Sequence, residues 1–204
     1  MPAGDLCTLS DLTSYLGDSS ISATSLTALS FLITQVSGWA QGFTERNLTG
    51  IQAYTFTADG QGSDAIFLPE GPVTGVTSVS VDGTAIPASP GSPTYGFLAS
   101  DCDVALIGGY FPRGRRNVVI TYTAGYSYTF TPGAGGNAAL DVLTGTPADL
   151  RWAVIETVAL RFKRRASLGK NSEGITGQST SYDNSITPKD ALAIFQKYKK
   201  NIPW

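Results

Sequence analysis

The chain has 204 residues, 42% of them hydrophobic, which is enough for one domain with a substantial core. It contains no histidine, and this excludes Ser-His-Asp and Cys-His catalysis as well as histidine metal sites. The net charge is −2, which by itself indicates no polyanionic partner.

The charges are unevenly distributed along the chain. Residues 1–150 hold 4 basic and 12 acidic residues, a balance of −8, whereas residues 151–204 hold 10 and 4, a balance of +6. Such asymmetry indicates two surfaces with different partners. The alternative is a solvated basic helix end followed by a lysine-rich tail.

Two cysteines, Cys7 and Cys102, are too few for a metal site and mark no disulfide framework, so a reducing cytoplasm is expected. The N-terminus has no basic region followed by an apolar run, and we predict no signal peptide. The chain contains no run of about 18 apolar residues, so a membrane partner is not expected either.

The first 50 residues predict two helices. Residues 8–17 are typical of a short helix that Thr8 caps and Gly17 closes. From Thr24 to about Leu48, apolar residues recur at spacings of three and four and predict a long helix. This stripe spans fewer than three heptads, which favours a packed helix over a free coiled coil. It consists of Leu26, Leu29, Ile33, Val36, Ala40 and Phe43.

From residue 51 the apolar period changes to two, which is typical of strands. Asp59-Gly60 and Asp82-Gly83 are turn signals between them. Residues 51–130 therefore predict an inserted antiparallel β subdomain of about five to seven strands. The predicted strands are 51–58, 65–68, 73–81, 84–86, 95–98, 104–107 and 117–123.

Residues 131–145 form a Gly-rich linker that leads into a third helix, Thr146 to Gly169. Thr146 is predicted to cap this helix, Pro147 suits its first turn, and the charge of Asp149 favours the exposed N–H groups there. Its apolar side repeats every four residues. The repeat consists of Leu150, Val154, Val158 and Phe162.

Residues 169–186 are polar and rich in Gly and Ser, and they are interpreted as a mobile loop. A last helix begins at Thr187-Pro188, which repeats the start signal of the third. Ala191, Ile194, Phe195 and Tyr198 form its apolar face, and lysines crowd its end.

These elements predict an α+β protein. Residues 1–50 and 146–204 would form a small four-helix bundle, because each helix shows one apolar face. The antiparallel β insertion would lie between the second and third helices.

Catalytic and ligand-binding motifs are weak or missing. There is no P-loop, and Ser167-Leu168-Gly169-Lys170 matches the Ser-x-x-Lys pattern without the other motifs of that enzyme class. Asp101 and Asp103 lack the further oxygen ligands that a calcium site needs. We therefore expect no enzyme activity, no cofactor and no metal.

The end of the third helix carries four basic residues, Arg161, Lys163, Arg164 and Arg165. At helical spacing Arg161 and Arg165 share a face, while Lys163 points away. One interpretation is that they complement the helix dipole and keep the chain soluble. The other is contact with phosphates or with an acidic protein surface, including that of another copy.

Six pieces of sequence follow one another in a recognisable order over nearly the whole chain. They are DLTSYLG, WAQGFTERNL, PVTGVTSVSVDG, VVITYTAGY, TPADLRWAVIETVALRFKRR and ALAIFQKYKK. This order resembles the phage head–tail connector, or adaptor, proteins of the gp6/gp15-like type.

The resemblance implies a structural virion protein of the neck of a tailed phage, assembled in the host cytoplasm. Such proteins form a homo-oligomeric ring, here expected to be a dodecamer, between the portal and a stopper or tail-completion protein, and DNA passes through it during ejection. In the family the C-terminal segment commonly engages the portal. The candidate portal-interface residues are Ile194, Phe195, Tyr198, Lys199, Ile202 and Trp204; the subunit or DNA-channel candidates are Arg161, Lys163, Arg164, Arg165 and Lys170.

A second hypothesis belongs to a different class. The β insertion contains aromatic residues that would suit a binding module for a polymer or a host surface, although aromatics also pair across strands. They are Tyr54, Phe56, Tyr95, Tyr110, Tyr122, Tyr126 and Tyr128.

Overall fold

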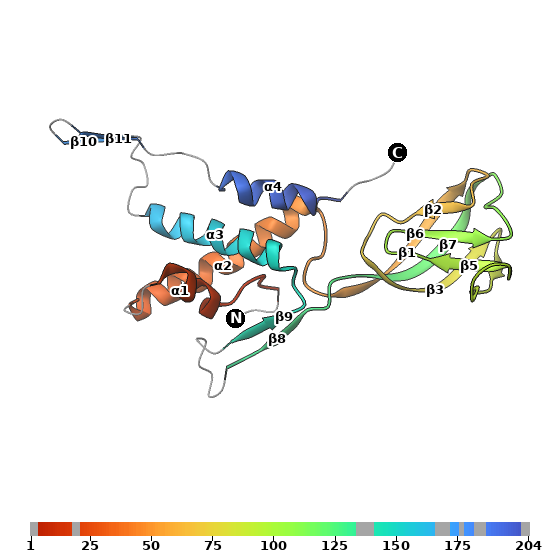
Figure 1. The fold of residues 1–204 in the computed structure, drawn as a ribbon, viewed down its shortest axis with the longest axis horizontal. Coiled ribbons are helices and arrows are strands. Elements are labelled where there is room, and N and C mark those ends of the chain that lie inside the picture. Colours follow the sequence, from red (N-terminus) through yellow and green to blue (C-terminus); the bar gives the residue numbers. More distant parts are fainter. Residues whose placement is uncertain are drawn as a thin grey trace. The chain divides into compact units, whose positions relative to one another are not determined.

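The computed structural model describes residues 4–17, 21–133, 141–165, 172–175, 178–181 and 187–200. Within these ranges the chain forms two compact units. We call Met1–Thr49 with Tyr128–Lys199 the helical unit, and Gly50–Ser127 with Lys200–Trp204 the β unit. Figure 1 shows the elements of each.

The helical unit contains the four described helices and two hairpins. The helices are α1 (Leu9–Leu16), α2 (Ala23–Thr44), α3 (Ala148–Arg164) and α4 (Lys189–Lys197). The hairpin strands are β8 (Thr129–Thr131) with β9 (Val142–Thr144) and β10 (Ser172–Ile175) with β11 (Gln178–Ser181).

The β unit contains seven strands in its described residues. They are β1 (Ile51–Gly60), β2 (Ala65–Phe67), β3 (Val73–Val81), β4 (Thr84–Ile86), β5 (Gly96–Ala99), β6 (Asp103–Ile107) and β7 (Gly114–Gly125).

The prediction of an α+β protein is correct, but the predicted four-helix bundle is wrong. Most described elements are strands, and sheets form in both units. Two of the helices, α1 and α4, span only 8 and 9 residues. Each helix does have one apolar face, but the short helices α1 and α4 bury theirs against α2 and α3. The four helices therefore do not pack as equal members of a bundle.

The first helix follows the sequence closely. Thr8 caps α1, and its hydroxyl accepts a hydrogen bond from the Asp11 N–H, while the Asp11 carboxylate accepts one from the Thr8 N–H. Gly17 ends the helix in the left-handed conformation, at φ 67°. In α2, the central part of the predicted stripe is fully buried: Leu29, Ile33, Val36 and Ala40.

The predicted caps of the two C-terminal helices are wrong. The N-cap positions are Pro147 for α3 and Pro188 for α4, and neither has a side-chain cap. The Thr146 hydroxyl is buried without a hydrogen-bond partner. Both prolines have an extended ψ, 134° at Pro147 and 146° at Pro188, so each lies before its helix and the first helical residues are Ala148 and Lys189.

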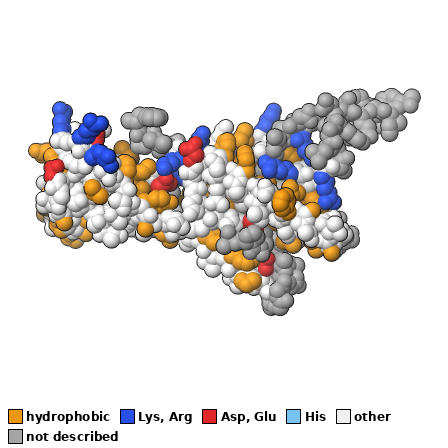
Figure 2. All heavy atoms as spheres, turned by 180° about the vertical axis from the view of Figure 1, so that it is seen from behind, with side chains coloured by type: hydrophobic (Ala, Val, Ile, Leu, Met, Phe, Trp, Pro, Cys, Tyr) orange, Lys and Arg blue, Asp and Glu red, His pale blue; other side chains and the backbone are white. Residues whose placement is uncertain are grey.

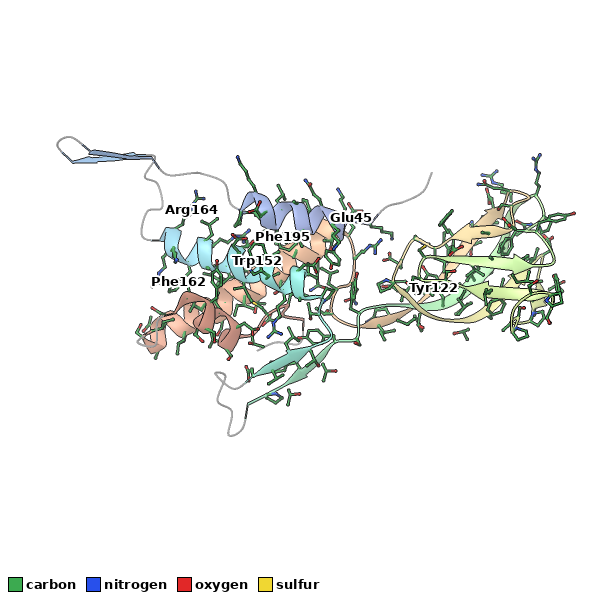
Figure 3. The ribbon with its side chains drawn as sticks, in the orientation of Figure 1. Glu45, Tyr122, Trp152, Phe162, Arg164 and Phe195 are labelled. Carbon is green, nitrogen blue, oxygen red and sulfur yellow. The ribbon has the colours of Figure 1, made fainter. Side chains whose placement is uncertain are left out.

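Two antiparallel sheets make up the β unit, in the strand orders β1-β7-β3-β4 and β2-β6-β5. Strand β7 alternates as a half-buried strand should, with every second residue from Val118 to Ala124 buried. Residues from both sheets share one core, which includes Tyr122 (Figure 3). The Tyr122 ring lies 5.7 Å from that of Tyr54, centroid to centroid. The core contains Leu68, Val79, Val81, Phe97, Val104, Leu106, Phe111, Val118, Ile120, Tyr122 and Ala124.

Two glycines permit close backbone contacts in the β unit. A Cβ at Gly60 would lie 1.9 Å from the Pro112 carbonyl oxygen, and one at Gly125 would lie 2.3 Å from that of Gly50. Gly125 also has a φ of 126°, which other residues rarely adopt. The predicted turn at Asp59-Gly60 is instead a β-bulge, through which β1 continues to Gly60.

The hairpins of the helical unit were not predicted. Strands β8 and β9 pair at the two ends of the segment that was interpreted as a linker, and residues 134–140 lie outside the described ranges. Strands β10 and β11 pair within the segment that was interpreted as a mobile loop. These strands are three or four residues long and border or lie in segments rich in Gly and Ser, whose loop signal outweighed them. No helix in the described part of the chain is long and apolar enough to cross a membrane.

Candidate assembly surface

The basic end of α3 contacts α2 at two places. The Arg161 guanidinium lies over the Trp39 ring of α2, 5.6 Å from its centroid. The Arg165 guanidinium lies over the Phe162 ring at 4.0 Å and donates a hydrogen bond to the Ser25 hydroxyl. Arg161 and Arg165 thus both contact α2. Lys163 is exposed and lines a separate groove.

A cluster of aromatic rings joins α2 to α4. Trp39 stacks on Phe43 with centroids 5.3 Å apart, and Phe195 meets the Trp39 ring edge-on at the same distance. Phe195 is fully buried and points from α4 toward the other helices (Figure 3). Lys199 lies over Phe43 at 5.7 Å. The Arg161 guanidinium and the Lys199 ammonium therefore each lie over a ring of this cluster. These cation–π contacts add to the contacts between the rings.

Asp149 connects the start of α3 to the end of α4. Its carboxylate accepts hydrogen bonds from the Tyr198 hydroxyl (2.5 Å), the Lys197 ammonium (2.9 Å) and the Leu150 N–H (2.9 Å). Burial alone would raise the pKa of Asp149, but the hydrogen bonds from Tyr198, Lys197 and Leu150 outweigh it and lower that pKa below 3.8. The carboxylate therefore stays charged and fixes the C-terminal end of α4.

Arg151 makes a second connection of this kind. Its Nε donates to the Asp11 carboxylate at 2.9 Å, Nη2 donates to the other oxygen, and Nη1 donates to the Leu143 carbonyl at 3.1 Å. One guanidinium thereby joins α1, β9 and α3 with the fork geometry that arginine offers.

The structure divides the candidate portal residues of α4. Phe195 is in the core, Tyr198 is hydrogen-bonded to Asp149, Ile194 is half-buried and Lys199 is exposed. The outward side of α4 is formed by small and polar residues: Lys189, Asp190, Ala193, Gln196 and Lys197. Ile202, Trp204 and the channel candidate Lys170 lie outside the described residues.

A groove of about 530 Å³ lies between α3, the start of α4 and the end of α1. One carboxylate oxygen of Glu156, Oε2, is buried in the helical unit without a hydrogen-bond partner. Burial, and then the charge of Asp190, raises the pKa of Glu156 above 4.5. The groove is lined by Tyr15, Glu156, Ala159, Leu160, Lys163, Pro188 and Lys189.

Figure 2 shows Lys and Arg side chains gathered on the helical unit and a second group on the β unit.

The described residues contain no group of three or more His, Cys, Asp or Glu side chains placed to hold a metal ion. Ser167, the serine of the Ser-x-x-Lys pattern, lies outside the described residues. Cys7 is buried and Cys102 is exposed, both as free thiols.

Sequence reasoning missed the residues that connect the helices. Asp149 was interpreted through the helix dipole, and neither Arg151 nor Glu156 was assigned a role. Asp149 and Arg151 reach other helices through Lys197, Tyr198 and Asp11, which lie 48 to 140 residues away along the chain. No local pattern encodes such a pairing.

A comparison of this chain with known protein families shows to which family it belongs. A family model described as "Head completion protein" matches residues 5–201, nearly the whole chain. The chain belongs to the head completion protein family.

Family membership confirms the resemblance to head–tail connector proteins that the sequence order indicated. This head completion protein is therefore a structural component of a phage-like virion. Its membership of a structural family favours a protein without catalytic activity.

Three solved structures resemble this head completion protein, and each similarity covers 96% of this chain and 90% of the other. Two are chains of the neck of a gene transfer agent (GTA) particle: the empty particle computed with C6 symmetry (21% identity, TM-score 0.47) and the native particle computed with C12 symmetry (19%, 0.43). The third is in the virion of the native particle (16%, 0.48). With TM-scores below 0.5 these similarities add nothing to the assignment, which stands on the family match. No curated protein matches the chain.

Proposed function

We propose that this head completion protein forms a homo-oligomeric ring, a dodecamer, in the neck of a tailed phage particle. The ring lies between the portal and a stopper or tail-completion protein, gives DNA a passage during ejection and has no enzymatic activity. It assembles in the host cytoplasm before it joins the virion. The observation that carries the proposal is the family match over residues 5–201.

Charge distribution supports contacts between different surfaces of neighbouring copies. The first 150 residues have a balance of −8 and the remainder +6. Subunits that pair unlike surfaces form heterologous contacts, and such contacts close into rings. Passing DNA would meet scattered basic side chains rather than a base-reading site, since it has to slide. The exposed Lys163 and Arg165 are the described candidates for this contact.

The portal-facing surface in this proposal is the outward side of α4 with the residues that follow it. Phe195 and Tyr198 hold α4 in place from within, so the surface offered to a partner is the polar one. Lys199 extends it, while Ile202 and Trp204, outside the described residues, stay portal candidates by their sequence alone.

The test combines the purified protein with its portal and measures ring formation by light scattering and electron microscopy. Ala193 is exposed on the outward side of α4, so Ala193→Arg should block portal docking without disturbing the core. Ala23→Arg, at an exposed alanine of α2, is the matched control and should dock normally. Failure of the unmodified protein to form a ring or a portal complex under any condition would refute the proposal.

One observation supports a second candidate function, that of a β-rich module that binds a polymer or host surface. The β unit exposes several large apolar side chains: Phe67 (60%), Tyr95 (49%), Leu98 (44%) and Tyr110 (66%). Exposed apolar side chains mark a binding surface where they form a contiguous patch. Replacing Tyr95 and Tyr110 with alanine should abolish host-surface binding and leave rings intact if this module exists.

A further inference from the structure

Strand β1 has one free edge. It pairs with β7 from Ile51 opposite Gly125 to Gly60 opposite Gly114, and no other described strand pairs with it. A free edge presents unpaired N–H and C=O groups to any extended chain, and proteins normally protect it with charges, prolines or short length. β1 is ten residues long, and residues 51–58 contain neither a charge nor a proline. Protection by a charge and a β-bulge is confined to its end, at Asp59 and Gly60, and residues 51–58 lack it.

A groove runs along part of this edge. Its volume is about 480 Å³, and it lies between Phe56–Asp59 of β1 and Ala65–Phe67 of β2. β2 is itself the outer strand of the second sheet, so two sheet edges border the same groove. Phe67 is 60% exposed beside it. A strand seated here would satisfy the backbone of β1 and cover apolar side chains at the same time.

The helical unit contains a segment of matching form. Strands β10 and β11 pair only with each other among the described residues, from Ser172 opposite Ser181 to Ile175 opposite Gln178. A hairpin of two short strands is marginally stable in water unless a further strand or a packed face supports it. The sequence Gln178–Ser181 carries no charge, so it would place no unpaired charge against the uncharged residues 51–58 of β1.

We propose that the β10–β11 hairpin of one copy adds as an extra pair of strands to the free edge of β1 in a neighbouring copy. This inference rests on the proposed ring. Donor and acceptor are different surfaces of one chain, so every copy gives a hairpin and receives one. Such a contact is heterologous and closes only as a ring or continues as a filament.

Chemical cross-linking tests the contact directly. Thr57→Cys lies on β1 in the groove, and Ser179→Cys lies on β11. Cys102 is exposed and is replaced by serine, whereas Cys7 is buried and stays. Copies with only one of the two new cysteines are mixed, assembled and treated with a short bismaleimide. We expect covalent dimers between unlike copies, and the double variant should give a ladder of multimers.

A matched control uses the other edge of the same sheet. Ala85→Cys is exposed on β4, and with Ser179→Cys it should give no dimers. Thr55→Lys and Thr57→Lys together would add charge to the β1 edge and should reduce cross-linking of assembled copies to the Ala85 level. Thr84→Lys on β4 should leave cross-linking unchanged.

The outcomes separate this inference from the proposed function. Rings seen by electron microscopy together with dimers from Thr57→Cys and Ser179→Cys copies support both. Rings without those dimers, or a cross-link formed within one chain only, overturn the strand-addition contact and leave the ring standing. Rings that form normally after residues 172–181 are replaced by a Gly-Ser chain of equal length also overturn it. Absence of rings under any condition overturns both.

Discussion

The β unit is built mainly from one continuous stretch, Gly50–Ser127, whereas the helical unit joins Met1–Thr49 to Tyr128–Lys199. The β unit has a core shared by two sheets, in which neighbouring strands pair in antiparallel register. In the helical unit, ionic and polar side chains connect elements that lie far apart along the chain, as Asp11 does with Arg151 and Asp149 with Tyr198.

This difference predicts where the molecule responds to its surroundings. Apolar cores and backbone ladders change little with pH or salt, but hydrogen-bonded carboxylates do. Among the residues that the structure describes, the groups whose pKa is shifted belong to the helical unit: Asp5, Cys7, Tyr128, Asp149, Glu156 and Arg161. We expect the stability of the helical unit to change with pH and salt, and that of the β unit to change little.

The largest effect is expected in the aromatic cluster of the helical unit. Phe195→Ala removes a fully buried ring that contacts Trp39 and should lower the free energy of unfolding by about 3–5 kcal/mol. Tryptophan fluorescence should shift to the red, because Trp39 loses its edge-on neighbour. Phe31→Ala, at a ring that is 64% exposed, should change stability by less than about 0.5 kcal/mol. Equal effects of the two would contradict the cluster.

A comparable loss is expected in the core of the β unit. Ile120 is fully buried on β7, and Ile120→Ala should cost about 2–5 kcal/mol. Urea unfolding followed by circular dichroism measures it. The exposed Ile51→Ala is the control. In a Trp204→Phe background, which removes the tryptophan of the β unit, the emission should keep its native wavelength, since Trp39 and Trp152 belong to the helical unit. A red shift like that of Phe195→Ala would show that loss of the β core also disrupts the helical unit.

The connection made by Asp149 should contribute less, because its side chain is 35% exposed. Asp149→Asn should lower stability at pH 7 by about 1–2 kcal/mol. The folded-state pKa of Asp149 lies below 3.8, so its contribution is fully present above that pH and is lost as pH falls through the folded pKa.

Urea titrations at several pH values measure this loss, with the exposed Asp64→Asn as the control. The difference between the unmodified protein and Asp149→Asn should shrink below pH 3.8. A difference that is the same at every pH would show that the effect is one of shape rather than charge.

Glu156 should act with the opposite sign. Its folded-state pKa is raised above 4.5 by burial and by Asp190, so its charge destabilises the fold at neutral pH. That cost disappears as pH falls through the folded pKa toward 4.5. Glu156→Gln should therefore raise stability at pH 7 by up to about 1 kcal/mol and have no effect in acid. Thermal unfolding at pH 7 and at a pH below 4.5 checks this. Destabilisation at pH 7 would mean that the Glu156 carboxylate has a stabilising partner.

The two cysteines compare the units without altering stability. Cys102 of the β unit is exposed, whereas Cys7 is buried and its thiol pKa is raised by burial and by the nearby charges of Asp11 and Asp5. A maleimide should label Cys102 at once and Cys7 only after unfolding. Fast labelling of both would show that the N-terminal segment opens in the native state.

Local patterns carried a large part of the fold. The Thr8 cap, the stripe from Leu29 to Ala40 and strands such as Val73–Val81 follow from residue spacing and turn chemistry alone. These features depend on neighbours within a few residues, and there propensity and periodicity act directly. The order of the same pieces also indicated the family.

Tertiary structure decided what each residue does once the pieces meet. Phe195 and Phe43 have similar patterns in sequence, yet the first is fully buried and the second lies at a half-buried edge beside Lys199. The short strands β8 to β11 exist through pairing, not through propensity. The roles of Asp149, Arg151 and Glu156 depend on groups brought together from distant parts of the chain, and hydrogen bonding and burial act on atoms that only folding places side by side.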